Sequence, residues 1–264
     1  MTVETAGLLR FAFVWGGFGA FLVFELLAPY RPSTVSKPGR WVTNLSLTAF
    51  NGLLMNLAFS TALLGTTAYV AEHRVGVLAL LDPPEWVRLV TAVAFMDFML
   101  YVWHLLNHEM PLLWRFHRVH HSDLNMDVST ATRFHIGELS ISAALKIALV
   151  FFLGLRLVEL VVFELLLVLC AQFQHSVVRV PGWFERAFWA FFVPPSMHRI
   201  HHSVVIRERN TNYGTIFSVW DRFLGTLLTG VNQSGIRIGM GAYPDLETLG
   251  LGRLLAMPFT RPVP

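Results

Sequence analysis

The chain has 264 residues, of which 54% are hydrophobic and 14% are charged. Soluble domains carry about 25% charged residues, so the composition excludes an ordinary soluble protein and predicts an integral membrane protein. The formal net charge is only +3 and the basic residues are scattered, which argues against a nucleic-acid-binding surface. The single cysteine, Cys170, excludes an intrachain disulfide and any thiolate-bound zinc or iron–sulfur site.

Four apolar regions are long enough to lie in a membrane, whose hydrocarbon core is about 30 Å thick. In chain order they are residues 6–27, 42–70, 87–106 and 139–173. The fourth is too long for one span, and the sequence GLR at its centre predicts a hairpin of two short helices. The fold class that we predict is therefore all-α integral membrane, with about four transmembrane or membrane-embedded helices and a helical cytoplasmic cap, in a single domain of residues 1–264.

The charged residues predict an orientation. The segment RPSTVSKPGR at 31–40 holds three basic residues and no acidic one, so the positive-inside rule places it in the cytoplasm. Counting spans from there places ten of the eleven histidines on the cytoplasmic side and leaves His73 in an outer loop. The segments 181–193 and 220–228 combine aromatic residues with few charges, which predicts helices that lie at the membrane surface.

Histidines gather in three clusters. The spacings are i, i+4 once and i, i+3, i+4 twice, and on a helix they place side chains on one face. Each cluster can then aim two or three ring nitrogens at a common point, which predicts metal binding. The clusters are His104 and His108; His117, His120 and His121; and His198, His201 and His202. His175 and His135 stand alone, at the two ends of the predicted hairpin.

The number of imidazoles bears on the metal. Imidazole suits zinc, copper, iron and nickel, and a zinc ion takes about three or four protein ligands. Eight to ten imidazoles favour two ions with four or five nitrogens each. Bis-histidine haem is a competitor, but it needs one histidine on each facing helix rather than adjacent pairs. His135 is either a tenth ligand or a residue that supports a ligand by a hydrogen bond.

Carboxylates near the histidines are candidates for orienting them. Asp97 lies inside the third apolar region, about two turns before His104, and a carboxylate within a span points to function. We predict that it accepts a hydrogen bond from a liganding imidazole; the alternative is a salt bridge to an arginine. Glu109, Glu138 and Asp221 are further candidates for this role or for proton relay.

Four segments carry a family resemblance. In chain order they are DFMLYVWHLLNHE (97–109), WRFHRVHHSDLNMDVSTATRFHIGE (114–138), QFQHS (172–176) and HRIHHS (198–203) with NTNYGTIFSVWDRFLGT (210–226). Together they resemble the motifs of the fatty acid hydroxylase/sterol desaturase superfamily of membrane-bound di-iron oxygenases, over about residues 90–230. The sequence departs from the pattern of many relatives at Leu105 and Ile136, where those have arginine and proline.

The resemblance implies a ligand set and a reaction. Two iron ions would be bound by nine histidines: His104, His108, His117, His120, His121, His175, His198, His201 and His202. O2 would be the cosubstrate, and a C–H bond of a lipid or sterol-like molecule would be hydroxylated or desaturated. We expect no haem or flavin in the chain, so electrons would come from a separate donor, a cytochrome b5-type protein or a ferredoxin with its reductase.

Two other function classes stay open at this point. A transporter or sensor of divalent metal predicts ligands spread along a path through the membrane, where the sequence offers only Asp97. A zinc-dependent membrane hydrolase predicts a motif such as HExxH, and His108–Glu109 lacks the second histidine at that distance. Metal analysis separates these alternatives from the oxygenase.

Overall fold

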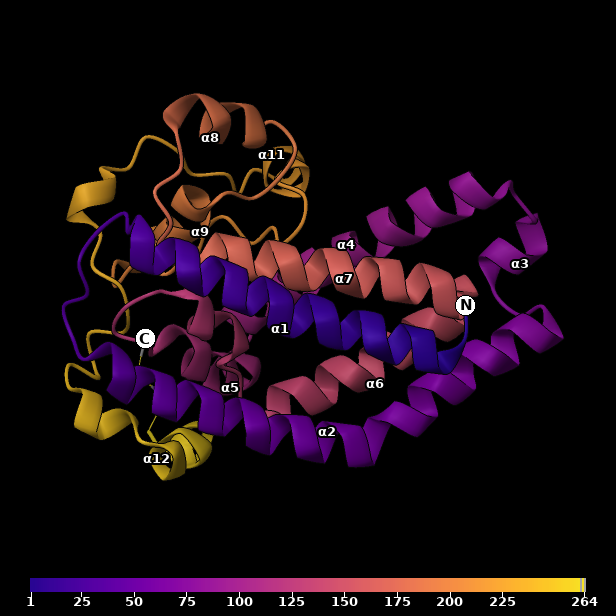
Figure 1. Cartoon of the computed structure of the whole chain (residues 1–264), viewed down its shortest axis with the longest axis horizontal. Coiled ribbons are helices and arrows are strands. Elements are labelled where there is room, and N and C mark those ends of the chain that lie inside the picture. Colours follow the sequence, from indigo (N-terminus) through magenta and orange to yellow (C-terminus); the bar gives the residue numbers. More distant parts are fainter. Residues whose placement is uncertain (262, 264) are drawn as a thin grey trace.

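The computed structural model describes residues 1–261 and 263, and within them the regular secondary structure is helical (Figure 1). Five segments are long and apolar enough to cross a membrane. They are α1 (Val3–Leu27), α2 (Lys37–His73) with the short α3 (Val77–Leu81), α4 (Glu85–Glu109), α6 (Ile136–Leu153) and α7 (Leu157–His175). The predicted all-α membrane fold is confirmed. The fourth apolar region forms the predicted hairpin, so the spanning segments number five.

The long helices form a bundle around a small apolar core. Helix α1 packs along α7, α2 packs along α6, and α4 contacts both α5 and α7 (Figure 1). Core side chains such as Met96, Val150 and Phe163 come from three different helices. The outward faces of the long helices are also apolar, which suits contact with lipid rather than with water.

At one end of the bundle, two glycines allow the hairpin to meet the α2–α4 connection. Gly154 ends α6 with φ +80°, and Gly76 has φ +98°. A Cβ atom on Gly76 would lie 2.3 Å from the Gly154 amide nitrogen. Only glycine adopts these backbone angles without strain and permits this approach. This end lies away from the three histidine clusters and His175, which gather at the other end of α4 and α7.

Helix α2 is longer than the membrane is thick. Its 37 residues extend about 56 Å at 1.5 Å per residue, so its first turns project into the cap. There the Asn44 side chain donates to Asp123 at 3.1 Å and to Ser129 at 2.9 Å, and Asn51 donates to the Phe134 carbonyl at 2.7 Å. Asn44 and Asn51, two polar residues within the predicted second span, therefore face the cap.

The cap consists of short helices and loops from two parts of the chain, one between α4 and α6 and one after α7. Its elements are α5 (Pro111–His121), η1 (Val128–Thr132), α8 (Gly182–Phe188), α9 (Pro195–His201), α10 (Ile206–Arg209), α11 (Val219–Leu224), η2 (Gln233–Gly235), η3 (Leu246–Leu249), α12 (Leu251–Ala256) and η4 (Met257–Phe259). The two predicted surface helices correspond to α8 and α11 but are shorter than predicted. They expose Trp183 (69%) and Phe223 (82%), as a membrane-surface helix would.

A buried ionic network fastens the segment after α5 to α2. The Arg40 guanidinium donates to Asp123 at 2.6 Å and to Asp127 at 2.6 Å, and all three side chains are almost fully buried. Burial alone would raise the pKa of Asp123, but the charges of Arg40 and Arg133, together with hydrogen bonds from Arg40 and Asn44, hold it well below its usual range. The network therefore fixes the loop that leads from the second histidine cluster back to the membrane.

Candidate metal centre

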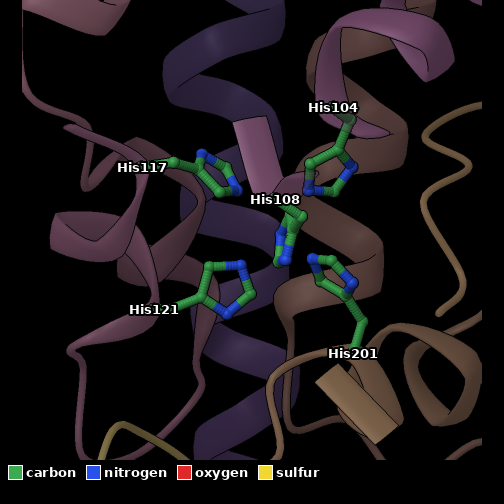
Figure 2. Close-up of side chains that lie close together, drawn as sticks. All are labelled: His104, His108, His117, His121 and His201. Carbon is green, nitrogen blue, oxygen red and sulfur yellow. The ribbon is translucent and has the colours of Figure 1, made fainter. Parts of the chain in front are cut away.

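Four helices bring the histidines together. The end of α4 carries His104 and His108, α5 carries the second cluster, the last residue of α7 is His175, and α9 with the residue after it carries the third cluster. All nine histidines predicted as ligands are buried. They form two groups whose candidate ligand atoms lie within 4.8 Å of one another. The first group, drawn in Figure 2, is His104, His108, His117, His121 and His201; the second is His120, His175, His198 and His202.

Each HxxHH cluster is divided between the two groups. On α5, His117 and His121 join the first group while His120 joins the second, and on α9 the middle histidine, His201, likewise crosses over. Each cluster thus aims two of its imidazoles at one group, as predicted, and the third imidazole of each HxxHH cluster faces the other group. Successive helix residues are rotated by about 100° around the helix axis, so adjacent histidines diverge. The ring planes of His120 and His121 form an angle of 89°.

In the first group, Nδ1 atoms are tied to oxygen acceptors. His104 Nδ1 donates to the Tyr213 carbonyl at 2.8 Å, His201 Nδ1 to the Thr211 carbonyl at 2.8 Å, and His117 Nδ1 to Glu138 Oε1 at 2.8 Å. His108 Nδ1 faces the Asn210 side-chain oxygen at 3.3 Å. The Nε2 atoms of these four histidines are buried and lack a hydrogen-bond partner within residues 1–261 and 263. Figure 2 shows the five rings turned toward a shared space.

In the second group, ring nitrogens face each other directly. His175 Nε2 lies 2.9 Å from His198 Nε2 and 3.1 Å from His120 Nε2, and His198 Nε2 lies 3.1 Å from His202 Nε2. Two of these rings are held from behind: His175 Nδ1 donates to the Ala171 carbonyl at 2.7 Å and His120 Nδ1 to the Arg133 carbonyl at 3.2 Å. Four convergent nitrogens, two of them on rings whose Nδ1 protons are bonded to carbonyls behind, suit a shared cation.

The charge state of the cap histidines also fits metal binding. Burial lowers their pKa values well below the usual 6.5, and the neighbouring imidazoles lower them further; the residues concerned are His120, His121, His198, His201 and His202. They are therefore neutral at pH 7, and a neutral imidazole can donate a lone pair to a metal. A donor set of imidazole nitrogens suits borderline transition metals such as iron and zinc.

Asp97 has partners other than the predicted one. Its carboxylate accepts hydrogen bonds from the Ile216 amide at 3.0 Å, the Phe217 amide at 3.1 Å and the Trp220 indole at 2.8 Å. The predicted hydrogen bond from a liganding imidazole is therefore wrong. The reason is that the loop after α10 folds back over α4, and its amide groups occupy the carboxylate of Asp97. Asp97 thus anchors that loop to the membrane bundle.

The other three carboxylates differ in their distance from the rings. Glu138 contacts His117 directly, as given above. Asp221 accepts hydrogen bonds from the Tyr213 and Gly214 amides, both at 2.8 Å, and so holds the carbonyl that receives His104 Nδ1–H. Glu109 is exposed and acts on Tyr213 rather than on a histidine. Burial raises the pKa of the Tyr213 phenol, and the negative charge of Glu109 raises that pKa further.

His135 lies outside both groups. Its Nδ1 accepts the Gly137 amide proton at 2.9 Å and caps the start of α6, and its Nε2 lies 3.1 Å from the Leu255 carbonyl. Both ring nitrogens are thus occupied by the backbone.

Apart from Glu138, the acceptors that orient the rings were missing from the sequence predictions. Four of them are backbone carbonyls, of Tyr213, Thr211, Arg133 and Ala171, and carbonyls carry no side-chain signal. Asn210 could have been found, because it opens the NTNYG segment that follows the third histidine cluster. Its side chain faces His108.

A cavity of about 340 Å³ adjoins both histidine groups. It extends into the bundle between α4, α6 and α7, and most of its lining is apolar, including Leu100, Leu145 and Val168. Histidines of both groups line one end of it. Asn107 also lines it, is 1% exposed, and has both side-chain amide atoms unpartnered within the described part of the chain. The site can therefore receive an apolar molecule that carries a polar group.

Comparison with known proteins finds relatives that are named as hydroxylases or monooxygenases. An ornithine lipid hydroxylase from Rhizobium tropici is 29% identical over 245 residues, covering 90% of this chain and 72% of the relative. Human cholesterol 25-hydroxylase is 28% identical over 154 residues, 56% of this chain and 55% of the relative. An alkylglycerol monooxygenase from Caenorhabditis elegans is 30% identical over 163 residues, 55% of this chain and 27% of the relative. No solved structure matches the chain.

The sequence model of the family described as fatty acid hydroxylase matches residues 89–226. This range includes every residue of the two histidine groups, from His104 to His202, together with Asp97, Glu138 and Asp221. The matched part covers more than half of the 264 residues. The chain therefore belongs to the fatty acid hydroxylase family and is an oxidoreductase of lipids.

Proposed function

We propose that this protein is a non-haem di-iron oxygenase that hydroxylates or desaturates a C–H bond of a membrane lipid or sterol-like molecule, with O2 as cosubstrate. The observation that carries the proposal is the convergence of nine buried imidazoles into groups of five and four beside an apolar cavity. Relatives named for hydroxylation of ornithine lipid and of cholesterol support a lipid substrate. Two bound iron ions would supply the activation of O2 and the oxidation of the C–H bond.

The residues of the chain have separate tasks in this proposal. The nine histidines hold the metal ions, and Glu138 with the backbone carbonyls fixes which ring nitrogen faces them. The apolar walls of the cavity exclude water from the reacting carbon. The amide of Asn107 lies at the wall of the cavity, three residues after His104, and is free to bond a polar group of the substrate.

Electrons would reach the site from outside the chain. We propose a separate donor of the cytochrome b5 or ferredoxin type, which would dock on the cap. The positive-inside rule places the cap, and with it the histidines, on the cytoplasmic side of the membrane, where such donors are reduced.

Metal analysis and lipid analysis test the proposal together. We expect about two iron ions per purified chain, and a host lipid that gains one oxygen atom or loses two hydrogen atoms when the protein is expressed. His120→Ala should abolish the change, because it removes a ligand of the second group. His73→Ala is the matched control, since His73 is exposed and lies at the other end of the bundle. One zinc ion per chain and an unchanged lipid profile would favour a hydrolase instead.

A further inference from the structure

Three helices contribute ionised side chains to a cluster inside the membrane bundle. Arg10 of α1 donates to Glu164 Oε2 of α7 at 2.8 Å, and Lys146 of α6 donates to Glu164 Oε1 at 2.9 Å. Each of the three residues lies seven positions from the end of its helix that is remote from the histidines. They are thus at one common depth, about 10 Å along the helix axes. Ionisable groups within membrane spans are rare and point to function.

The cluster carries one excess positive charge, because two cations share a single carboxylate. A second ionic cluster, at the bundle end, is different: Arg88 and Arg156 there meet Glu85 and Glu159, so its charges cancel. An uncompensated charge in a medium of low dielectric constant is costly. The Lys146 cluster is therefore one anion short of neutrality.

Lys146 lines the same cavity as the histidines. The cavity follows α6 from Glu138, whose carboxylate contacts His117, to Leu149. Lys146 lies eight residues beyond Glu138, about 12 Å along the helix axis, and its side chain is 27% exposed. Between the two ends the walls are mainly apolar. The cavity thus has metal-binding groups at one end, apolar walls along its length and a cation near the other end.

We propose that Lys146, with Arg10 behind it, binds the anionic group of an acyl-chain substrate, a carboxylate or a phosphate. The bound chain would then extend along the apolar walls toward the histidines. Because the anion is fixed, the oxidised carbon is set by its distance from the charged end of the chain and not from the methyl end. This inference rests on the proposed function, since it takes the bound chain to be the substrate. A volume of about 340 Å³ suits a single chain.

Binding measurements test the proposal without requiring oxidation. A fluorescent acyl methyl ester is bound to the purified full chain in detergent and displaced by palmitic acid, by a lysophosphatidic acid or by palmitic acid methyl ester. Lys146→Met removes the excess charge and leaves the neutral Arg10–Glu164 pair. We expect Lys146→Met to weaken competition by whichever of the two acids binds the site by about tenfold or more. Competition by palmitic acid methyl ester should be unchanged.

Two further variants separate charge from packing. Lys146→Arg keeps the cation and should retain most of the affinity for the acid. Lys37→Met is the matched control, since Lys37 is the other lysine of the chain and lies at the start of α2, away from this cavity. If Lys146→Met weakens competition by palmitic acid, the bound anion is a carboxylate. If it weakens competition by lysophosphatidic acid, the bound anion is a phosphate. Equal losses for acid and ester, or no loss for either acid, would overturn the proposal.

Product analysis provides a second test. In a series of acyl chains of increasing length, we expect the oxidised carbon to keep its number counted from the charged end. A position that stays constant from the methyl end would overturn the inference even if the chain is an oxygenase. Conversely, Lys146-dependent binding without any oxidised product would contradict the proposed function while leaving the anion site established.

Discussion

Nδ1 of His117 donates a hydrogen bond of 2.8 Å to Oε1 of Glu138, and both residues are buried. Glu138 stands in the first turn of α6, directly after the loop that leaves the second histidine cluster. The contact turns Nε2 of His117 toward the other rings of its group and leaves it unpartnered among the described residues. A carboxylate behind a ligand makes the imidazole a stronger donor and fixes its tautomer. Glu138 therefore has the role first predicted for Asp97.

Replacing this carboxylate should weaken metal binding in the first group. For Glu138→Gln we expect metal affinity to fall about 10- to 100-fold, because the amide cannot stabilise the liganding imidazole as the charge does. Metal retained per chain at increasing chelator concentration measures the effect. Glu109→Gln is the control, since Glu109 is exposed although it follows His108 directly. Equal losses in both variants would contradict a specific role for Glu138.

The two histidine groups should respond differently to the loss of one ring. His202→Ala leaves three imidazoles in the second group, whereas His121→Ala leaves four in the first. A group that keeps four imidazoles should hold its ion more firmly than a group that keeps three, because each ligand adds to metal affinity. We expect His202→Ala to lose about one metal ion per chain and His121→Ala to keep both, measured as metal content after dialysis. The opposite order would show that the groups are assigned wrongly.

The buried ionic network should be important for stability. Arg40→Met leaves Asp123 and Asp127 as buried charges without this partner, and breaking a buried pair costs about 3–5 kcal/mol of unfolding free energy. Unfolding in detergent, followed by the loss of helical signal from the cap, measures it. Arg74→Ala removes an ion pair with Asp82 whose side chains are 68% and 72% exposed. That change should stay within about 0.5 kcal/mol, and a loss as large as that of Arg40→Met would refute the argument.

Two glycine substitutions should have opposite effects. Gly154 has φ +80°, and a Cβ atom there would lie 2.6 Å from the Val75 carbonyl oxygen. Gly154→Ala should destabilise the bundle by about 1–2 kcal/mol or more, because an L side chain disfavours that backbone conformation. Gly65 is exposed on α2 and has nothing within 4 Å of the added atom. Gly65→Ala should stabilise by up to about 1 kcal/mol. Thermal midpoints in detergent distinguish the two.

Local pattern was sufficient for much of this protein. The apolar runs predicted the membrane helices, because a helix that meets lipid is apolar on every face. The break at Gly154 predicted the hairpin. The i, i+3 and i+4 spacings predicted that eight histidines form three clusters, since helix periodicity depends only on sequence separation. His175 was added as the ninth ligand by the family resemblance. The resemblance to a family identified the chemistry before any distance was known.

The assignment of each histidine to a group depended on tertiary structure. His120 and His201 turn away from their cluster neighbours because successive helix residues are rotated, and the packing of the helices decides which rings they then meet. For the same reason Asp97 binds a loop more than a hundred residues away, and Glu138 takes its place beside a ring. The excess charge at Lys146 also emerged only from packing, because Arg10, Lys146 and Glu164 lie on three different helices. Sequence determined which residues could act, and the packing of helices determined which of them meet.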